Sequence, residues 1–97
     1  MELNENTAYH ITVQGEIAEI APKNGRTFRL KEAQSLVDGY IEVLFLNSDW
    51  IMVINEDGKY TKGYNEKATQ LAHSWQAIRG NDYICGDVIV CLSKQLP

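Results

Sequence analysis

Residues 40–55 read YIEVLFLNSDWIMVIN, and this stretch decides the fold. It holds two runs rich in Ile, Val, Leu, Phe and Trp, residue types that favour a pleated strand. Asn47, Ser48 and Asp49 stand between the runs and favour a turn. The pattern predicts an antiparallel hairpin made of residues 40–46 and 50–54.

A three-residue loop in this hairpin pairs Leu44 with Met52 and Glu42 with Ile54. Side chains alternate between the two faces of a strand. One face then carries Ile41, Val43, Phe45, Ile51 and Val53. The other is apolar too, although an antiparallel sheet commonly leaves one face to water. We therefore expect another part of the chain, a protein partner or a second copy to cover the candidate interface, which consists of Leu44, Leu46, Trp50 and Met52.

Two segments show the spacing of amphipathic helices. The first lies within residues 26–39. Thr27 is its expected cap, and Phe28 and Arg29 are alternative boundaries. Gly39 is expected to end it. The second spans residues 66–79 and is expected to be capped by Asn65. Their apolar stripes predict that both helices pack on the sheet.

Two more stretches predict strands. Residues 9–21 favour a hairpin, in which either a four-residue loop over residues 14–17 or a two-residue turn at Gln14 and Gly15 sets the register. Residues 88–92 are apolar on both faces, which predicts an interior strand beside the central hairpin. The fold expected is α+β, an antiparallel sheet of about four or five strands with two helices packed on one face. We expect residues 1–8 to be a flexible tail and residues 9–97 a single domain.

Composition excludes several classes of protein. The net charge of −4 makes a nucleic-acid partner unlikely, because such proteins present a basic face. No apolar run approaches ~18 residues, so neither a transmembrane helix nor a membrane partner is expected. The polar start MELNENTAYH lacks the apolar segment of a secretory signal, and we expect a cytoplasmic protein.

The residues that carry chemistry are sparse. Cys85 and Cys91 stand ~20 Å apart if they lie on one strand, too far for a disulfide, and are expected to be buried thiols. His10 and His73 are not spaced to join them at a metal. The sequence therefore predicts neither a metal nor a cofactor. No nucleophile stands with a base, so catalysis is less expected than binding.

Four blocks of sequence resemble one family. They are PKNGRTFRLKEAQSLVDGYIEVL (22–44), MVINEDGK (52–59), NEKAT (65–69) and GDVIVC (86–91). Their order and spacing are similar to the domain of unknown function 3846 family, small proteins that recur in bacterial mobile elements and phages, notably of Bacteroides-type genomes. The family has no established activity, and the resemblance implies none.

Among the recurrent positions of that family is a polar set in this chain, Glu42, Asn55, Glu56, Asn65 and Asp87. These residues have two interpretations: caps and turns of the scaffold, or one shared site between the sheet and the second helix. Glu42 is either a solvated edge residue or a carboxylate held in a cleft to bind something. The sequence favours a non-enzymatic protein-interaction module. The alternative is a small-molecule or peptide-binding domain, or an enzyme with a weak signature, that uses the polar set.

Overall fold

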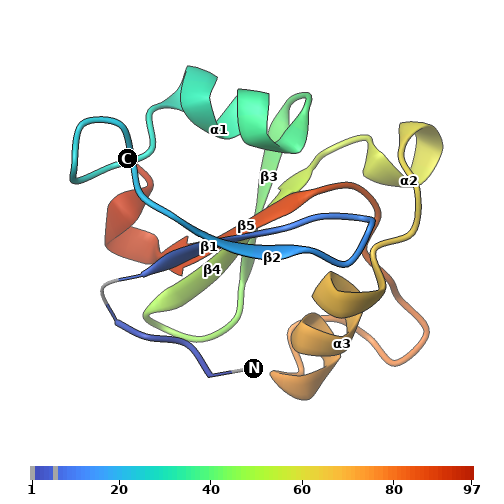
Figure 1. The fold of residues 1–97 in the computed structure, drawn as a ribbon. Coiled ribbons are helices and arrows are strands. Elements are labelled where there is room, and N and C mark those ends of the chain that lie inside the picture. Colours follow the sequence, from blue (N-terminus) through green and yellow to red (C-terminus); the bar gives the residue numbers. More distant parts are fainter. Residues whose placement is uncertain (1, 6) are drawn as a thin grey trace.

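A computed structural model describes residues 2–5 and 7–97, and in it one five-stranded sheet runs through the molecule (Figure 1). All of its paired strands are antiparallel, and their order is β2-β1-β5-β4-β3. The strands are β1 (Ala8–Ile11), β2 (Ile17–Ile20), β3 (Ile41–Phe45), β4 (Trp50–Asn55) and β5 (Val88–Leu92). The helices are α1 (Leu30–Val37), α2 (Gly58–Thr61) and α3 (Glu66–Ser74), with a 3₁₀ turn at Ser93–Gln95. The predicted α+β class and strand number are confirmed.

The central hairpin forms in the predicted register. Leu44 lies opposite Met52, as the three-residue loop predicts. The turn is held by Asn47, whose Oδ1 accepts hydrogen bonds from the backbone N–H of Asp49 (2.7 Å) and of Trp50 (2.8 Å). This side chain replaces backbone partners that the turn leaves unpaired, which is why asparagine suits the position.

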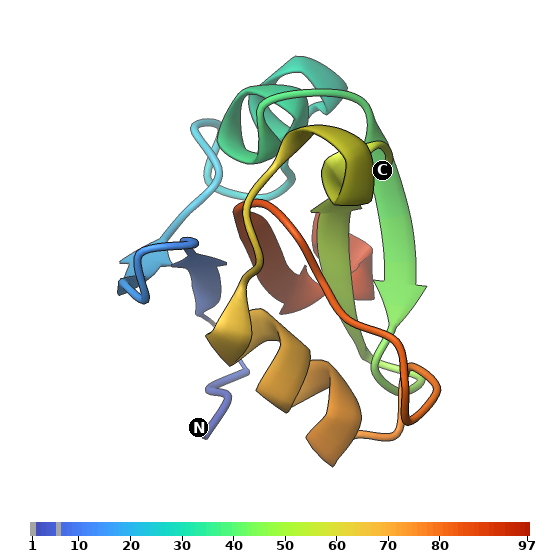
Figure 2. The same cartoon turned by 90° about the vertical axis from the view of Figure 1, so that its right-hand side faces the viewer.

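The two main helices lie on opposite faces of the sheet, so the prediction that both pack on one face is wrong (Figure 2). Successive residues of a strand point to opposite faces, so a strand contributes side chains to both cores. The face under α1 forms a core of Ala8, Phe28, Ala33, Val37, Ile51, Val53, Ile89 and Cys91. The face under α3 forms a second core that includes Ile11, Trp50, Met52, Val88, Val90, Ala68, Leu71 and Ala72.

The candidate interface is therefore not an open face. Met52 is 0 % exposed and Trp50 is 7 % exposed, Leu46 is buried, and Leu44 is half-buried. The reason is α3, which lays its apolar stripe over these side chains and is continued by Trp75 and Ile78 beyond its end. A single chain covers both faces, so of the three expected covers it is another part of the chain that lies on the candidate interface, and the expectation of a partner or a second copy there is wrong.

The first hairpin has a different register from either alternative. Ile11 lies opposite Ile17, so residues 12–16 form the loop. Thr12 closes it twice: its N–H donates to Glu16 O (2.9 Å), and its Oγ1 accepts from Glu16 N–H (3.2 Å). β2 is an edge strand, and most of its side chains face solvent. Burial therefore places little constraint on which side chains pair.

The helix boundaries also differ from expectation. Arg29, one of the two alternative boundaries, precedes α1 in place of Thr27, and Asp38 instead of Gly39 ends the helix with a left-handed φ of 57°. Gly39 follows with φ 156°, and a Cβ there would lie 2.5 Å from Asn55 Nδ2. The glycine is needed for close approach to Asn55 rather than to end the helix. α3 stops at Ser74 instead of residue 79.

At the N-terminus, β1 includes Ala8, which was assigned to the tail and is buried. Leu3 packs against the core under α3, and the N–H of Asn4 donates to Tyr9 Oη at 3.0 Å. Residues 1 and 6 of the predicted tail lie outside the described residues.

Candidate functional site

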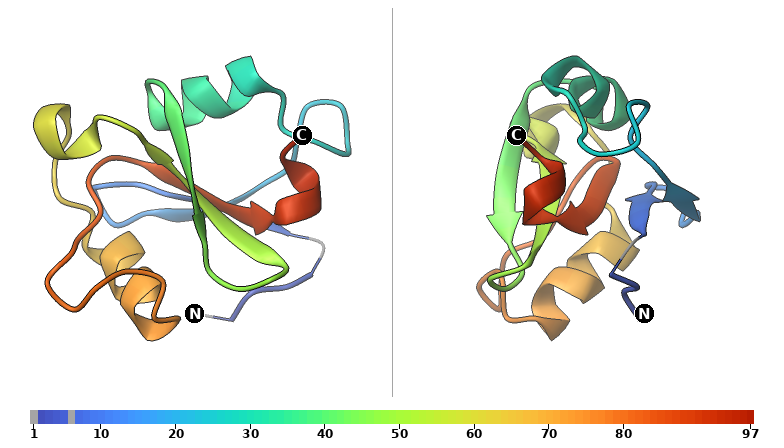
Figure 3. Two further views of the ribbon diagram at one scale, coloured as in Figure 1. Left: turned by 180° about the vertical axis from the view of Figure 1, so that it is seen from behind. Right: turned by 90° about the vertical axis from the view of Figure 1, so that its left-hand side faces the viewer.

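A cleft of about 250 Å³ opens on the α3 face of the sheet, where β3 and β4 meet α2 and the segment that follows α3. Figure 3 shows α2 and that segment at the same end of the molecule. The cleft is lined by Glu42, Leu44, Ile54, Asn55, Glu56, Lys59, Tyr60, Ile78, Asp82, Tyr83, Ile84 and Cys85. Three residues of the predicted polar set are thus brought together: Glu42, Asn55 and Glu56. Asn65 and Asp87 lie elsewhere.

Asn55 belongs to the scaffold of the cleft. Its Nδ2 donates to the carbonyls of Val37 (3.1 Å) and Asp38 (3.0 Å), and its Oδ1 accepts from the N–H of Asp57 (2.8 Å). The side chain is buried, so these bonds offset the loss of its contacts with water. Asn55 fastens the end of α1 to the start of α2, and its polar atoms are already used.

Asn65 and Asp87 also have structural roles. Asn65 is 0 % exposed; its Oδ1 accepts from Ala68 N–H (3.0 Å), which confirms the predicted cap. Its Nδ2 donates to the carbonyls of Ile11 (3.0 Å) and Gly86 (2.8 Å), so one side chain joins α3 to β1 and to the segment before β5. Asp87 Oδ1 accepts from Val13 N–H (2.9 Å) and holds the first hairpin loop.

Glu42 and Glu56 are different, because both side chains are exposed at the cleft. Among residues 2–5 and 7–97, neither carboxylate has a hydrogen-bond or ion-pair partner, and the salt bridges there involve Asp82 and Asp38 instead. Carboxylates without a partner beside a cleft are available to an incoming group. Of the five predicted residues, these two are the ones whose side-chain oxygens make no hydrogen bond or ion pair with the described residues.

One corner of the cleft already holds a cation of the protein itself. The Lys59 ammonium contacts the Asp82 carboxylate and lies 4.8 Å from the centroid of the Tyr83 ring. Asp82 raises the pKa of Lys59, and Lys59 in turn lowers the pKa of Asp82, so both groups stay charged around neutral pH. Tyr64 stacks at an angle on Tyr83, with ring centroids 6.3 Å apart. The local chemistry thus suits an ammonium group.

Sequence reasoning missed Lys59, Asp82 and Tyr83. Lys59 and Asp82 are 23 positions apart in the chain, and no spacing pattern links them. The remaining floor is apolar, formed by Leu44, Ile54, Ile78 and Ile84. Cys85 also lines the cleft, but burial raises the pKa of its thiol and keeps it protonated around neutral pH. The cleft thus offers charged and apolar side chains to a ligand, and its thiol is not activated as a thiolate.

A larger hollow, of about 950 Å³, lies at the other end of the sheet and contains none of the predicted residues. Across the part of the chain that the structure describes, there is no grouping of three or more His, Cys, Asp or Glu side chains suited to a metal ion. The described helices include none with the length and apolar character needed to cross a membrane.

No curated protein matches the chain significantly, and no solved structure does. One family model does match, and it extends over residues 6–95, from before β1 to the last turn of the chain. The four sequence blocks lie inside that span. The chain therefore belongs to the family described as Domain of unknown function (DUF3846).

Proposed function

We propose that this protein is a non-enzymatic interaction module that binds a basic segment of a partner protein in the cleft. A lysine or arginine side chain of the partner would place its cation between Glu42 and Glu56. The observation that carries the proposal is that both carboxylates stand at the cleft without a partner among the described residues. We also propose that the protein is cytoplasmic, and that it belongs to a mobile element, as the resemblance implies.

Charge supports a cationic ligand. The cleft contains the carboxylates of Glu42, Glu56 and Asp82 against the single ammonium of Lys59. An incoming cation meets unpaired negative charge, and complementary charge of this kind speeds encounter and selects the partner. An anionic ligand would be repelled at the same place.

Shape supports a long basic side chain rather than a bare ion. Lysine and arginine lay their methylene stems along apolar surface and keep the charged head in water. The isoleucines of the lining, Ile54, Ile78 and Ile84, offer such a surface in the same cleft as the exposed carboxylates. Lys59 shows how a cation is held here, with its ammonium on the Asp82 carboxylate and over the ring of Tyr83.

The test uses a fluorescently labelled peptide of alternating lysine and alanine, and a matched peptide in which norleucine replaces lysine. Norleucine keeps the apolar stem and removes the charge. We expect the lysine peptide to bind at least tenfold more tightly in fluorescence anisotropy, and the difference to shrink at high salt.

The double variant Glu42→Gln/Glu56→Gln should lose at least tenfold in affinity for the lysine peptide. Glu19→Gln is the matched control, because Glu19 is an exposed carboxylate on β2 away from the cleft. All variants should unfold within about 0.5 kcal/mol of the native protein, since exposed charges without partners contribute little to stability. Equal binding of both peptides, or equal loss in the Glu19 variant, would refute the proposal.

A further inference from the structure

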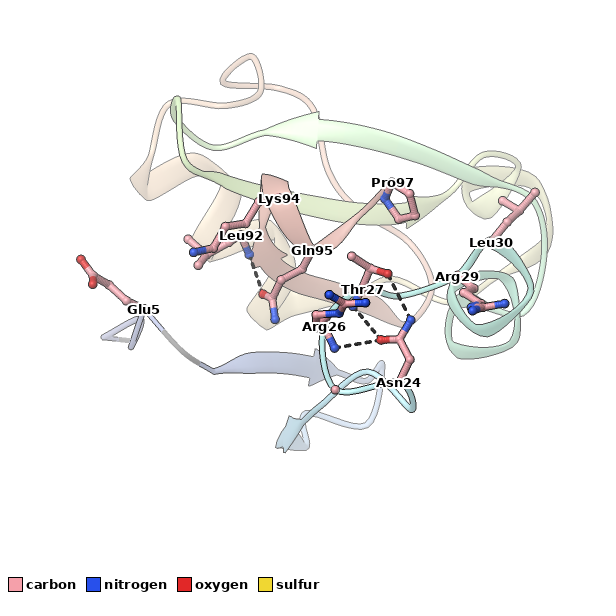
Figure 4. A pocket seen from close by; sticks show the side chains of 11 residues that line it. Glu5, Asn24, Arg26, Thr27, Arg29, Leu30, Leu92, Lys94, Gln95 and Pro97 are labelled. Atoms are coloured by element: carbon pink, nitrogen blue, oxygen red, sulfur yellow. Dashed lines mark hydrogen bonds between the residues drawn. The ribbon is translucent and has the colours of Figure 1, made fainter.

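The larger of the two hollows described above is a groove between the loop before α1 and the residues that close β5. Its lining includes Arg26, Arg29 and Leu30 on one wall and Leu92, Lys94 and Gln95 on the other. In Figure 4 the side chains of Arg26 and Arg29 stand on the loop side, while Glu5 lies apart from them at the far end. We call this hollow the basic groove.

The basic groove concentrates positive charge in an acidic protein. Three of the nine Lys and Arg residues line it, although the chain has a net charge of −4. Within the described part of the chain, Arg26, Arg29 and Lys94 make no ion pair, and Glu5 is the one carboxylate side chain in the lining. Asp49 and Glu5 share a neighbouring hollow with Lys94, whereas Arg26 and Arg29 do not line that hollow.

Both walls of the groove are held in place before any ligand arrives. Asn24 Oδ1 accepts from the N–H groups of Arg26 and Thr27, each at 2.8 Å, and Asn24 Nδ2 donates to Thr27 Oγ1 at 3.2 Å. Phe28 is fully buried, and its N–H donates to Gln95 O at 2.7 Å, which joins the two walls. Ordering of the walls in advance lowers the entropy that binding must offset.

We propose that the basic groove binds a small phosphorylated organic molecule of nucleotide size. Arginine guanidinium groups match phosphate oxygens in pairs of parallel hydrogen bonds, and two arginines with a lysine suit more than one phosphate. Leu30 and Leu92 add apolar lining for the uncharged part of the molecule. The volume falls in the range of roughly 300–1,000 Å³ that small-molecule sites occupy.

The groove and the cleft share no lining residue, so this inference stands or falls independently of the proposed interaction function. The probe is adenosine diphosphate, and adenosine is its uncharged counterpart. In a titration followed by amide chemical shifts, we expect ADP to move the signals of Arg26, Thr27, Arg29 and Lys94. Calorimetry should give an affinity for ADP at least tenfold above that for adenosine.

Arg26→Ala/Arg29→Ala should weaken ADP binding at least tenfold while the melting temperature stays unchanged, because both side chains are exposed. Arg79→Ala is the matched control, since Arg79 is an exposed arginine outside the groove. Binding of adenosine and ADP with equal affinity would overturn the inference, as would an equal loss in the Arg79 variant. A short oligothymidylate that binds the two arginines more tightly than ADP would overturn the choice of a small molecule and point to nucleic acid.

Discussion

The two faces of the sheet are built in different ways. Under α1 the core is apolar, with Phe28 and Cys91 among its fully buried members, and one buried polar side chain, Asn55, donates to the carbonyls of Val37 and Asp38 at the end of the helix. Under α3 the apolar core is accompanied by two buried polar side chains, Asn65 and Thr69. Thr69 Oγ1 donates to Asn65 O (2.8 Å) and accepts from Ile84 N–H (2.9 Å). The α1 face depends mainly on filled space, with the hydrogen bonds of Asn55 at the end of α1, whereas the α3 face depends more on hydrogen bonds of Asn65 and Thr69 and opens at one end into the cleft.

The largest expected effect tests the filled face. Phe28→Ala should lower the free energy of unfolding by about 4 kcal/mol, because it removes a fully buried ring and leaves a cavity between α1 and the sheet. Urea denaturation measures the change. Phe45→Ala is the matched control: Phe45 is 66 % exposed at the end of β3 and should cost less than about 1 kcal/mol. Similar losses for both variants would mean that the α1 face is not the tightly filled layer described.

A smaller effect tests the hydrogen-bonded face. Asn65→Ala should cost about 3 kcal/mol, because it leaves two carbonyls and one N–H buried without their partner and removes the cap of α3. Asn65→Asp keeps the acceptor for Ala68 but turns a donor toward two carbonyls into a negative oxygen, and it should not restore stability. Asn81→Ala, at an exposed loop position, serves as control. Full rescue by Asp would show that only the cap contributes.

The smallest effect is a dependence on pH that belongs to the filled face. Burial raises the pKa of the Cys91 thiol from 9.0 to about 12. The unfolded chain therefore loses this proton first as the pH rises, and the stability contributed by the neutral thiol is lost between pH 9 and pH 12.

At pH 10, one unit above the pKa of the unfolded thiol, the loss should be about 1.4 kcal/mol relative to pH 7, since one unit of pKa corresponds to that free energy. Unfolding in urea at several pH values measures it. Cys91→Ala should lack this component, while Cys85→Ala, which changes the thiol in the cleft, should keep it. Parallel pH profiles of the native protein and Cys91→Ala would contradict a strongly shifted thiol.

The sequence predicted those features that depend on neighbouring positions. The central hairpin followed from alternation of side chains and from Asn47, and the cap by Asn65 followed from its place before a helical stripe. Alternation also showed that both faces of the sheet are buried. It could not show which segment covers each face, because the apolar stripes of the two helices fit either side. The misassigned interface at Trp50 and Met52 arose from that ambiguity.

The candidate site was predictable in part for the same reason. Glu42 and Glu56 are odd charges beside apolar runs, a signal visible in one stretch of sequence. Lys59, Asp82 and Tyr83 meet only after α3 has returned the chain to the sheet. The pair Arg26 and Arg29 around the buried Phe28 is local, and a search for clustered cations within an acidic chain would have found it.

The order of the strands governs the order in which the protein can assemble. The two hairpins, β1–β2 and β3–β4, share no edge, and β5 is the strand that pairs with both. During synthesis the two hairpins therefore become part of one sheet only when residues 88–92 have left the ribosomal exit tunnel. The contacts that close the sheet span most of the chain, so they carry a large loop-closure cost. We expect the nascent chain to remain protease-sensitive until this central strand has been inserted.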